Sequence, residues 1–578
     1  MHQNNIVSAI GWFKKASLLG HALAQYKLGE LYLSGKEKDT QQAIYWLEKA
    51  AKQNIAPAQY RLSTINRKGI AVVQNIELAN YLLQQAAANQ YILAIYDLAM
   101  QHIELIDKKS DAINALKKIA TLYNYAPAQH QLGLLEFAAH NYAQALEWFN
   151  LAAKQSYPKS TLYVGKIYLE GLTDSINYTL AIKWLEQAAS YNIAEANYLL
   201  GVLYLTGRGV EQNIARAVEK LKLAADYNYT DSQYKLAVIY ADILYKPKIA
   251  HKYFIQAAQS GSIKAQYYLG LSYEIGRGTK QDYINAVYWY KTAANNNYTP
   301  AQTSYGRMLE YGYGTTKDLE QAINWYTKAI AKRSGKAAYF LANLYLNNET
   351  HRDKNDKRTV ELLHIASDHG IAQAYYPLGR LYELGVGARQ DYYTAVQYFR
   401  KAAKAGVSEA QYGLGSALIL GNGVSANFTQ AAKWLKLSAE QGNKDGQYLL
   451  ARLLEQGQGI TRSVKTALKY YLAAAKQGLA SAQYRVALIY EIDSKIENLV
   501  SNPVFAAYWY EKASQQGIPQ AQFKIAKLYS QGIGIRRNYV QAARWYLAAA
   551  KSGIAEAQEQ IAILYKTGKG IRINMHHA

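Results

Sequence analysis

Two short strings in this sequence have the residue types of a serine hydrolase, but they lack the setting that such chemistry needs. Ser156 and Lys159 form an S-x-x-K, and Lys566 to Gly568 read K-T-G. In serine enzymes that bind β-lactams, these motifs bring a helix-borne serine to face a β-strand. The sequence predicts no strand, and 566–568 has the pattern of an ordinary helix end. We therefore expect no nucleophilic catalysis from these residues.

Histidines and paired glycines are the other residues that could hold a ligand. His351, His364 and His369 form the one suggestive cluster, but their spacing is not that of metal ligands. Each G-x-G lacks the preceding strand and third glycine that would supply converging N–H groups to a phosphate. The chain has no cysteine, which excludes a thiolate nucleophile and a cysteine zinc site. The sequence thus predicts no catalytic residue, no metal site and no cofactor.

Composition indicates a long, helical and basic protein. Half of the 578 residues are apolar, 54 are tyrosine and only 8 are proline, which suits amphipathic helices that bury aromatic rings. The formal net charge is +23, and such an excess favours anionic partners such as lipid head groups, acidic polymers or nucleic acid. We do not expect specific recognition of nucleic acid.

The amino terminus bears on the compartment. It has no charged start followed by a sufficiently long apolar stretch, and the chain has no uncharged run of about 18 residues. We expect no membrane span. A complete chain would be cytoplasmic, whereas a fragment that lacks an upstream export signal would be periplasmic or secreted, and both alternatives stay open.

One phrase recurs along the chain and predicts an array of one small unit. It reads AQYKLGELY from Ala24, AQYYLGLSY from Ala265, AQYGLGSAL from Ala410 and AQYRVALIY from Ala482. Such self-similarity at a period near 36 residues is typical of a solenoid. The position of the central tyrosine recurs at 26, 60, 96, 130, 162, 198, 234, 267, 303, 339, 376, 412, 448, 484, 523 and 559.

The copy that begins at residue 263 shows how the first helix of a unit, helix A, is specified. Ala265, Leu269 and Tyr273 are spaced by four and share one helical face. Gly276 and Gly278 follow, and a glycine just past a helix end readily takes the left-handed conformation that stops the helix. The sequence predicts a helix that ends before this glycine pair.

A second helix, helix B, follows in the same copy. Asp282 stands where its carboxylate can accept hydrogen bonds from the unpaired N–H groups of a helix start. Ala286, Trp289 and Ala293 then place one large ring between small residues on one stripe. Neither helix can cover its apolar face alone, so we expect antiparallel pairs that stack on one another.

The complete pattern, A-x-A-Q-Y-x-L-G-x-L-Y-x-x-G-x-G-V followed by A-x-x-W-x-x-K-A-A-x-x-G, resembles the Sel1-like repeat family, relatives of the tetratricopeptide repeats. The resemblance covers essentially the whole chain. It implies an all-α, right-handed α-solenoid of about 16 stacked helix pairs, superhelical with a concave face lined by helix A. The glycine pair recurs at 207/209, 276/278, 312/314, 385/387, 421/423, 457/459 and 532/534.

Departures from the pattern suggest a division of the chain. Units near Tyr96 and His130 lack the glycine pair and look more like tetratricopeptide repeats, and two polar insertions should project as loops. We expect a partial first unit (helix B only, 1–21), repeats with shorter units (22–157), regular repeats (158–346), an insertion loop (347–358), regular repeats (359–490), an insertion loop (491–503) and the last repeats with an incomplete final unit (504–578).

Positions opposite the buried stripe of helix A predict a partner-binding groove that is apolar in its early part and charged in its later part. The early part is mostly apolar and would accept the apolar stripe of a partner helix or peptide. Its residues are Leu93, Tyr96, Met100, Ile103, His130, Leu134, Phe137, Leu169, Tyr198, Val202 and Leu205. The later part would carry a charged ladder for register and selectivity. It consists of Arg307 with Glu310, Arg380 with Glu383 beside Tyr376, and Arg452 with Glu455 beside Tyr448.

Alternatives remain for both parts. Tight winding would bury the apolar set between neighbouring helices A, and the Arg and Glu pairs would then only satisfy each other. Replacing Met100 and Phe137 with glutamate separates the alternatives, since loss of binding with an intact fold supports the groove.

Basic residues also recur at the turns: Arg208, Arg277, Lys280, Lys317, Arg389, Arg462, Arg536, Arg537, Lys569 and Arg572.

The resemblance implies a non-catalytic scaffold or adaptor that binds one or more proteins. Family members serve in signalling, protein quality control, cell-envelope assembly and bacterial interactions with host cells, and we favour a bacterial setting. The alternative is a factor that binds cell wall, polysaccharide or another anionic polymer through the recurring tyrosines and the basic turns. The partner itself is not specified by the sequence.

Overall fold

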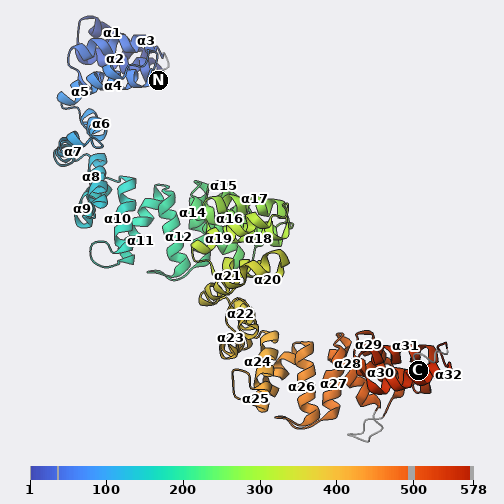
Figure 1. Cartoon of the computed structure of the whole chain (residues 1–578). Helices are drawn as coiled ribbons and strands as arrows, with labels where there is room; N and C mark the ends of the chain where they lie inside the picture. Colours follow the sequence, from blue (N-terminus) through green and yellow to red (C-terminus); the bar gives the residue numbers. More distant parts are fainter. Residues whose placement is uncertain (1, 35–37, 492–500, 573–578) are drawn as a thin grey trace. The chain divides into compact units, whose positions relative to one another are not determined.

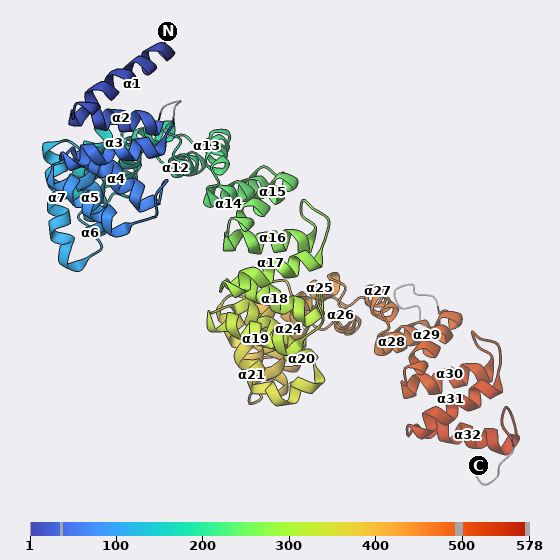
Figure 2. The same cartoon turned by 90° about the horizontal axis from the view of Figure 1, so that it is seen from above.

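The chain folds as helices throughout the part that the structure describes. The computed structural model describes residues 2–34, 38–491 and 501–572, with side chains except those of 2–9 and 349–355. These residues form 32 α-helices and no strand. They divide into two compact units, the first made of residues 1–269 with 277–279 and the second of 270–276 with 280–578. Figures 1 and 2 show helix following helix in antiparallel pairs within each unit. This confirms the all-α solenoid of stacked helix pairs.

Most helices have the same length of 13 residues. Those of the first unit are α1 (His2–Leu18), α2 (Ala22–Ser34), α3 (Thr40–Lys52), α4 (Ala56–Lys68), α5 (Ile76–Ala88), α6 (Ile92–His102), η1 (Ile106–Lys108), α7 (Lys109–Leu122), α8 (Ala126–Ala138), α9 (Tyr142–Lys154), α10 (Pro158–Glu170), α11 (Tyr178–Ser190), α12 (Ala194–Thr206), α13 (Ile214–Asp226), α14 (Thr230–Val238), η2 (Ile239–Ile243) and α15 (Pro247–Gln259). The division of the units falls in α16 (Ile263–Ile275) and the turn after it.

The second unit continues the same alternation. Its helices are α17 (Tyr283–Asn295), α18 (Thr299–Tyr311), α19 (Leu319–Ala331), α20 (Gly335–Asn347), α21 (Glu349–Asp368), η3 (Ala372–Ala374), α22 (Tyr375–Leu384), α23 (Tyr392–Lys404), α24 (Ser408–Leu420), α25 (Phe428–Glu440), α26 (Lys444–Gln456), α27 (Val464–Lys476), α28 (Ala480–Glu491), α29 (Pro503–Gln515), α30 (Pro519–Gln531), α31 (Tyr539–Lys551) and α32 (Ala555–Thr567).

Local capping sets where these helices begin and end. Asp282 precedes α17, and its Oδ1 accepts a hydrogen bond of 3.0 Å from the Asn285 N–H. Gly312 follows α18 with φ of 73°, and its N–H donates to the Met308 carbonyl. The caps satisfy backbone groups that a helix end leaves unpaired. Both predicted signals are confirmed.

Within a pair, a glycine of helix A makes room for a large side chain of helix B. The ring of Tyr290 is fully buried, and a Cβ at Gly270 would lie 2.8 Å from its Cδ1. Trp289, which the sequence predicts on the buried stripe, is only half-buried. The structure therefore shifts the buried ring by one residue, because the close approach at Gly270 is filled by Tyr290.

The second glycine of each turn packs on the preceding repeat. At Gly459, with φ of 66°, a Cβ would lie 2.2 Å from the carbonyl carbon of Phe428, the first residue of α25. Gly423 and Gly534 make the same approach to Tyr392 and Pro503. The glycine pair is thus a contact between repeats as well as a helix stop.

The predicted loop at 347–358 is wrong for most of its length. The segment instead forms the first half of α21, a helix of 20 residues that begins at Glu349. Arginine, lysine and glutamate lose little side-chain freedom in a helix, and the segment has no glycine or proline to stop one. The other predicted loop, 491–503, falls mostly on 492–500, which lie outside the described residues.

Candidate partner-binding surface

A row of aromatic side chains follows the helix A side of the first unit. In four repeats, the aromatic residue of the recurring phrase meets an N-cap tyrosine that precedes the next helix A. We call the tyrosines among these residues the tyrosine row. The centroid distances are 5.3 Å for Tyr60–Tyr91, 5.6 Å for Tyr96–Tyr125, 5.1 Å for His130–Tyr157 and 5.2 Å for Tyr198–Tyr229.

The row is neutral, hydrogen-bonded and partly open. The Tyr60 hydroxyl donates to Asp97 Oδ2 at 2.7 Å, which joins α4 to α6. Burial raises the pKa of Tyr96 to about 12, so its hydroxyl stays protonated near neutral pH. All tyrosines of the row are half-buried. Such rings combine apolar area with a polar group and lose little entropy on binding.

The groove predicted from the sequence does not include five tyrosines of this row: Tyr60, Tyr91, Tyr125, Tyr157 and Tyr229. Tyr91, Tyr125, Tyr157 and Tyr229 stand directly before a helix A, outside the recurring phrase. The available signal was their repetition at the same place in early units, where late units have Val407, Leu479 or Ile518.

The predicted apolar residues divide into surface and core. Leu93 is 36% exposed, whereas Ile103 is 5% exposed and His130 is 6% exposed. His130 Nδ1 lies 2.9 Å from Ser160 Oγ, and burial lowers the pKa of its imidazole to about 4. The prediction that Ile103 and His130 face the groove is wrong, because neighbouring helices cover them. The remaining residues are half-buried: Tyr96, Met100, Leu134, Phe137, Leu169, Tyr198, Val202 and Leu205.

Phe137 belongs to a tight aromatic cluster. Its ring centroid lies 5.3 Å from that of Tyr142, 5.5 Å from Tyr163 and 6.5 Å from Phe149. Phe149 is fully buried. A glutamate at Phe137 would therefore damage the core, which makes Met100 and Leu93 the better positions for testing binding.

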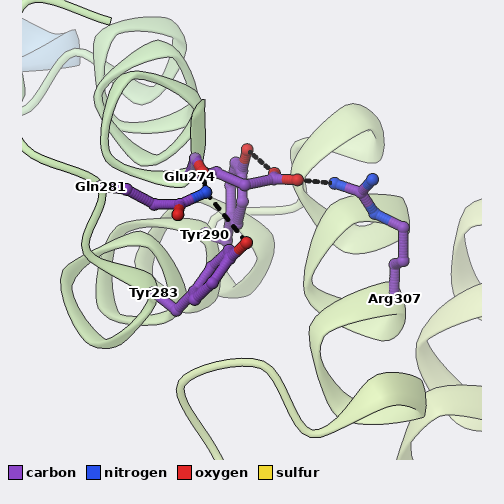
Figure 3. A network of polar contacts seen from close by, with 5 residues as sticks. All are labelled: Glu274, Gln281, Tyr283, Tyr290 and Arg307. Carbon is purple, nitrogen blue, oxygen red and sulfur yellow. Dashed lines mark hydrogen bonds and ion pairs between the residues drawn. The ribbon is translucent and has the colours of Figure 1, made fainter. Parts of the chain in front are cut away.

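The predicted charged ladder is mostly wrong in its pairing. Arg380 does pair with Glu383 within α22. Arg307, however, pairs with Glu274 of the preceding helix A (Figure 3) rather than with Glu310. The reason is that stacked repeats bring successive helices A side by side. The carboxylate of Glu274, which also accepts a hydrogen bond from Tyr290, then lies within reach of Arg307.

The third predicted pair departs in the same way. Glu455 pairs with Arg485 of the next helix A, while Arg452 is exposed. Tyr448 is half-buried and lies 5.6 Å from the ring of Tyr471. Tyr376 is also half-buried, 6.0 Å from the ring of Phe399.

These glutamates form a recurring latch between repeats. Glu274 accepts from the Tyr290 hydroxyl at 2.7 Å as well as from Arg307. Two further latches have the same parts. They are Glu455 with Tyr471 and Arg485, and Glu491 with Tyr510 and Lys524. Two of the charges predicted to read a partner, Arg307 and Glu455, thus join neighbouring repeats instead.

Glu310 accepts a hydrogen bond from a tyrosine, as the glutamates of the latches do, but the pKa of its carboxyl is raised. It accepts from the Tyr326 hydroxyl at 2.6 Å and is only 9% exposed. Burial raises the pKa of its carboxyl, and hydrogen bonds from Tyr326 and Tyr311 oppose that rise. A raised folded-state pKa contributes stability that is complete below the unfolded pKa and is lost as pH rises through the folded value.

Glu310→Gln should therefore flatten the pH dependence of stability. The amide oxygen can still accept from Tyr326 but does not ionise. We expect the thermal stability of this variant, relative to the native chain, to be higher at pH 7 than at about pH 4. Glu320→Gln, at an exposed site on α19, is the control and should not show this rise. A constant difference for Glu310→Gln would contradict the argument.

The residues considered for catalysis and metal binding lie in a turn, at the end of a helix and between tyrosine hydroxyls. Ser156 lies in a turn with φ of 61°, and 566–568 ends α32 at Gly568. His364 lies between the hydroxyls of Tyr382 at 2.9 Å and Tyr398 at 3.2 Å. The side chain of His351 lies outside the described residues. Among described side chains, no group of three or more metal-ligating residues is present.

The basic turn residues are largely exposed, and some make internal contacts. Arg208, Lys280 and Lys317 are exposed. Arg277 Nη2 donates to the Ala241 carbonyl at 2.6 Å, and Arg462 Nε donates to the Glu455 carbonyl at 3.0 Å. Within the described ranges, no helix is both long and apolar enough to cross a membrane.

Comparison with known proteins supports this architecture. The crystal structure of c5321, a protective antigen present in uropathogenic Escherichia coli strains and displaying an SLR fold, is 30% identical with a TM-score of 0.54. That match covers 74% of this chain and 84% of c5321.

Curated relatives match over shorter stretches. DAP3-binding cell death enhancer 1 of Mus musculus is 35% identical over 156 residues, which is 27% of this chain and 30% of that protein. An uncharacterized protein of Neisseria meningitidis serogroup B is 26% identical over 155 residues, 27% of this chain and 32% of that protein. The chain thus spans about 30% of the length of these relatives.

The model of the Sel1 repeat matches most of the chain. The matched residues are 3–21, 22–55, 56–91, 122–157, 158–190, 194–226, 230–262, 263–298, 299–334, 335–371, 372–407, 408–443, 444–479, 480–518, 519–554 and 555–578. Residues 92–121, which the model does not match, form α6, η1 and α7. Sel1 repeat solenoids generally mediate protein–protein interaction and are typically without catalytic activity, since they offer extended surfaces rather than enclosed sites. On the matched repeats and the stacked helix pairs, this chain belongs to the Sel1 repeat family.

Proposed function

We propose that this chain is a non-catalytic interaction scaffold that binds a segment of a partner protein on the helix A side of its first unit. The tyrosine row carries the proposal. Exposed Leu93 and half-buried Met100 lie on the same helix, α6, as Tyr96 of the row. Together they offer apolar contact area with hydroxyl groups along it, which suits an amphipathic helix or extended peptide.

The physical basis is preorganisation. The ring pairs and the Tyr60–Asp97 hydrogen bond hold the side chains in place before a partner arrives. Binding then costs less side-chain entropy than it would on a mobile surface. A bacterial adaptor role, including contact with host cells, is part of the proposal, and the similarity to a protective antigen of uropathogenic Escherichia coli supports it.

Site-specific photo-crosslinking tests the site. A photoreactive residue at position 93 should capture a protein that the same residue at position 81 does not capture. Tyr81 is 58% exposed on helix B of the same region and provides a matched control. Capture of the same protein with equal yield at both positions would contradict the proposed surface.

A second candidate function is binding of an anionic polymer, such as a cell-wall component or polysaccharide, along the basic turns. The exposure of Arg208, Lys280 and Lys317 favours it. Affinity for such a polymer should fall steeply with salt, because binding releases counterions. Weak salt dependence would argue against this candidate.

A further inference from the structure

Charge is unevenly divided between the two helices of each pair in residues 375–476 of the second unit. The A helices α22, α24 and α26 together carry three Lys or Arg and four Asp or Glu. The B helices α23, α25 and α27 together carry eight Lys or Arg and one Glu. The basic excess in this part of the chain therefore lies on the B helices.

A groove lies along α27 within this basic region. It has a volume of about 420 Å³ and is lined by Lys465, Leu468, Lys469, Leu472, Ala473 and Lys476. These positions share one face of the helix. Leu468 is only 6% exposed, whereas Lys469 and Lys476 are exposed. The groove thus has an apolar floor and a cationic rim.

An exposed lysine also occupies the equivalent place on the preceding B helix, α25. Lys433 of α25 stands 36 residues before Lys469 and occupies the same place in its repeat. It is exposed, as is Lys436 one turn further along α25, which pairs with Glu440 at 3.9 Å. Exposed positive charge at this place thus recurs in two successive repeats.

We propose that this groove binds an acidic amphipathic helix of a protein partner. Apolar side chains of that helix would contact Leu468, Leu472 and Ala473, and its carboxylates would face Lys469, Lys476 and Lys433. The recessed floor favours a helix over a lipid surface, because a membrane-binding face needs apolar side chains that project outward. Charge complementarity would speed association and select against basic partners. This site is separate from the tyrosine row and does not depend on it.

A pair of designed peptides tests the proposal on the full chain. The probe is a fluorescein-labelled helix of about 18 residues with leucines on one face and glutamates on the other, and its match has lysine in place of glutamate. Fluorescence anisotropy should show binding of the acidic peptide alone. Lys433→Gln/Lys469→Gln/Lys476→Gln should weaken that binding at least about tenfold. Equal binding of both peptides, or failure of the acidic peptide to bind, would overturn the proposal.

Two further variants separate groove binding from general attraction. Lys280→Gln/Lys317→Gln/Arg389→Gln removes the same charge from the turns and should leave the affinity unchanged. Ala473→Arg adds a positive charge but fills the groove, so we expect weaker binding. Tighter binding by Ala473→Arg, or equal losses in the two triple variants, would show that the charge acts without the groove. Binding to phosphatidylserine vesicles or heparin without binding to the acidic peptide would also overturn the proposal.

Discussion

Gly459→Ala is expected to destabilise its repeat by more than about 3 kcal/mol. The residue has φ of 66°, which costs a non-glycine residue about 1–2 kcal/mol. In addition, the new Cβ would lie 2.2 Å from the Phe428 carbonyl carbon, a backbone atom that cannot move aside without shifting α25. The contact between the start of α25 and the turn that contains Gly459 should therefore open. Hydrogen exchange of α25 and α26 measures this, and we expect protection to fall about 100-fold.

Gly442→Ala is the matched control for this prediction. Gly442 also has a positive φ, 89°, but a Cβ at this position would have no neighbouring atom within 4 Å. It should show the conformational cost alone, about 1 kcal/mol. If both variants lose the same protection, the close approach between repeats contributes nothing to stability, and the structural role of the second turn glycine is wrong.

Glu455→Leu is expected to loosen two repeats at once. The substitution leaves the fully buried Tyr471 without its acceptor and Arg485 of the next repeat without its ion pair. An unsatisfied buried donor costs about 1–3 kcal/mol, and the ion pair adds less because Arg485 is 36% exposed. We expect a loss of about 2 kcal/mol, visible as faster hydrogen exchange in both α27 and α28.

Glu383→Leu provides the comparison for the latch. Its ion pair with Arg380 lies within α22, so its loss should cost about 0.5 kcal/mol and leave the next repeat unchanged. Faster exchange confined to α27 in Glu455→Leu would contradict a role of Glu455 in joining repeats.

The helices could be predicted from signals that lie close together in the sequence. A capping aspartate at 282 and a glycine at 312 act on backbone groups within a few residues, so their effect can be predicted without knowing the neighbours. The prediction of a loop at 349–358 was wrong because the charged residues of this segment are compatible with either a helix or a loop. The segment is helical because it continues into the rest of α21.

The candidate surface was harder to predict because its contacts cross repeats. Arg307 and Glu310 are close in sequence, yet Arg307 pairs with Glu274, 33 residues earlier. Ile103 and His130 follow the surface spacing of the phrase, but neighbouring helices bury them. Both outcomes depend on how tightly successive pairs stack, which the pattern of one repeat does not contain.

The affinity of the captured partner for the full chain tests the central claim most directly. The claim is that the helix A side of the first unit, around Leu93 and Met100, is the protein-binding surface. Titration of the purified partner should give a dissociation constant at least about tenfold higher for Leu93→Glu/Met100→Glu than for the native chain, with the helix content unchanged. Tyr81→Glu should bind as the native chain does. Native affinity in Leu93→Glu/Met100→Glu, or a larger loss in Tyr81→Glu, would place the surface elsewhere.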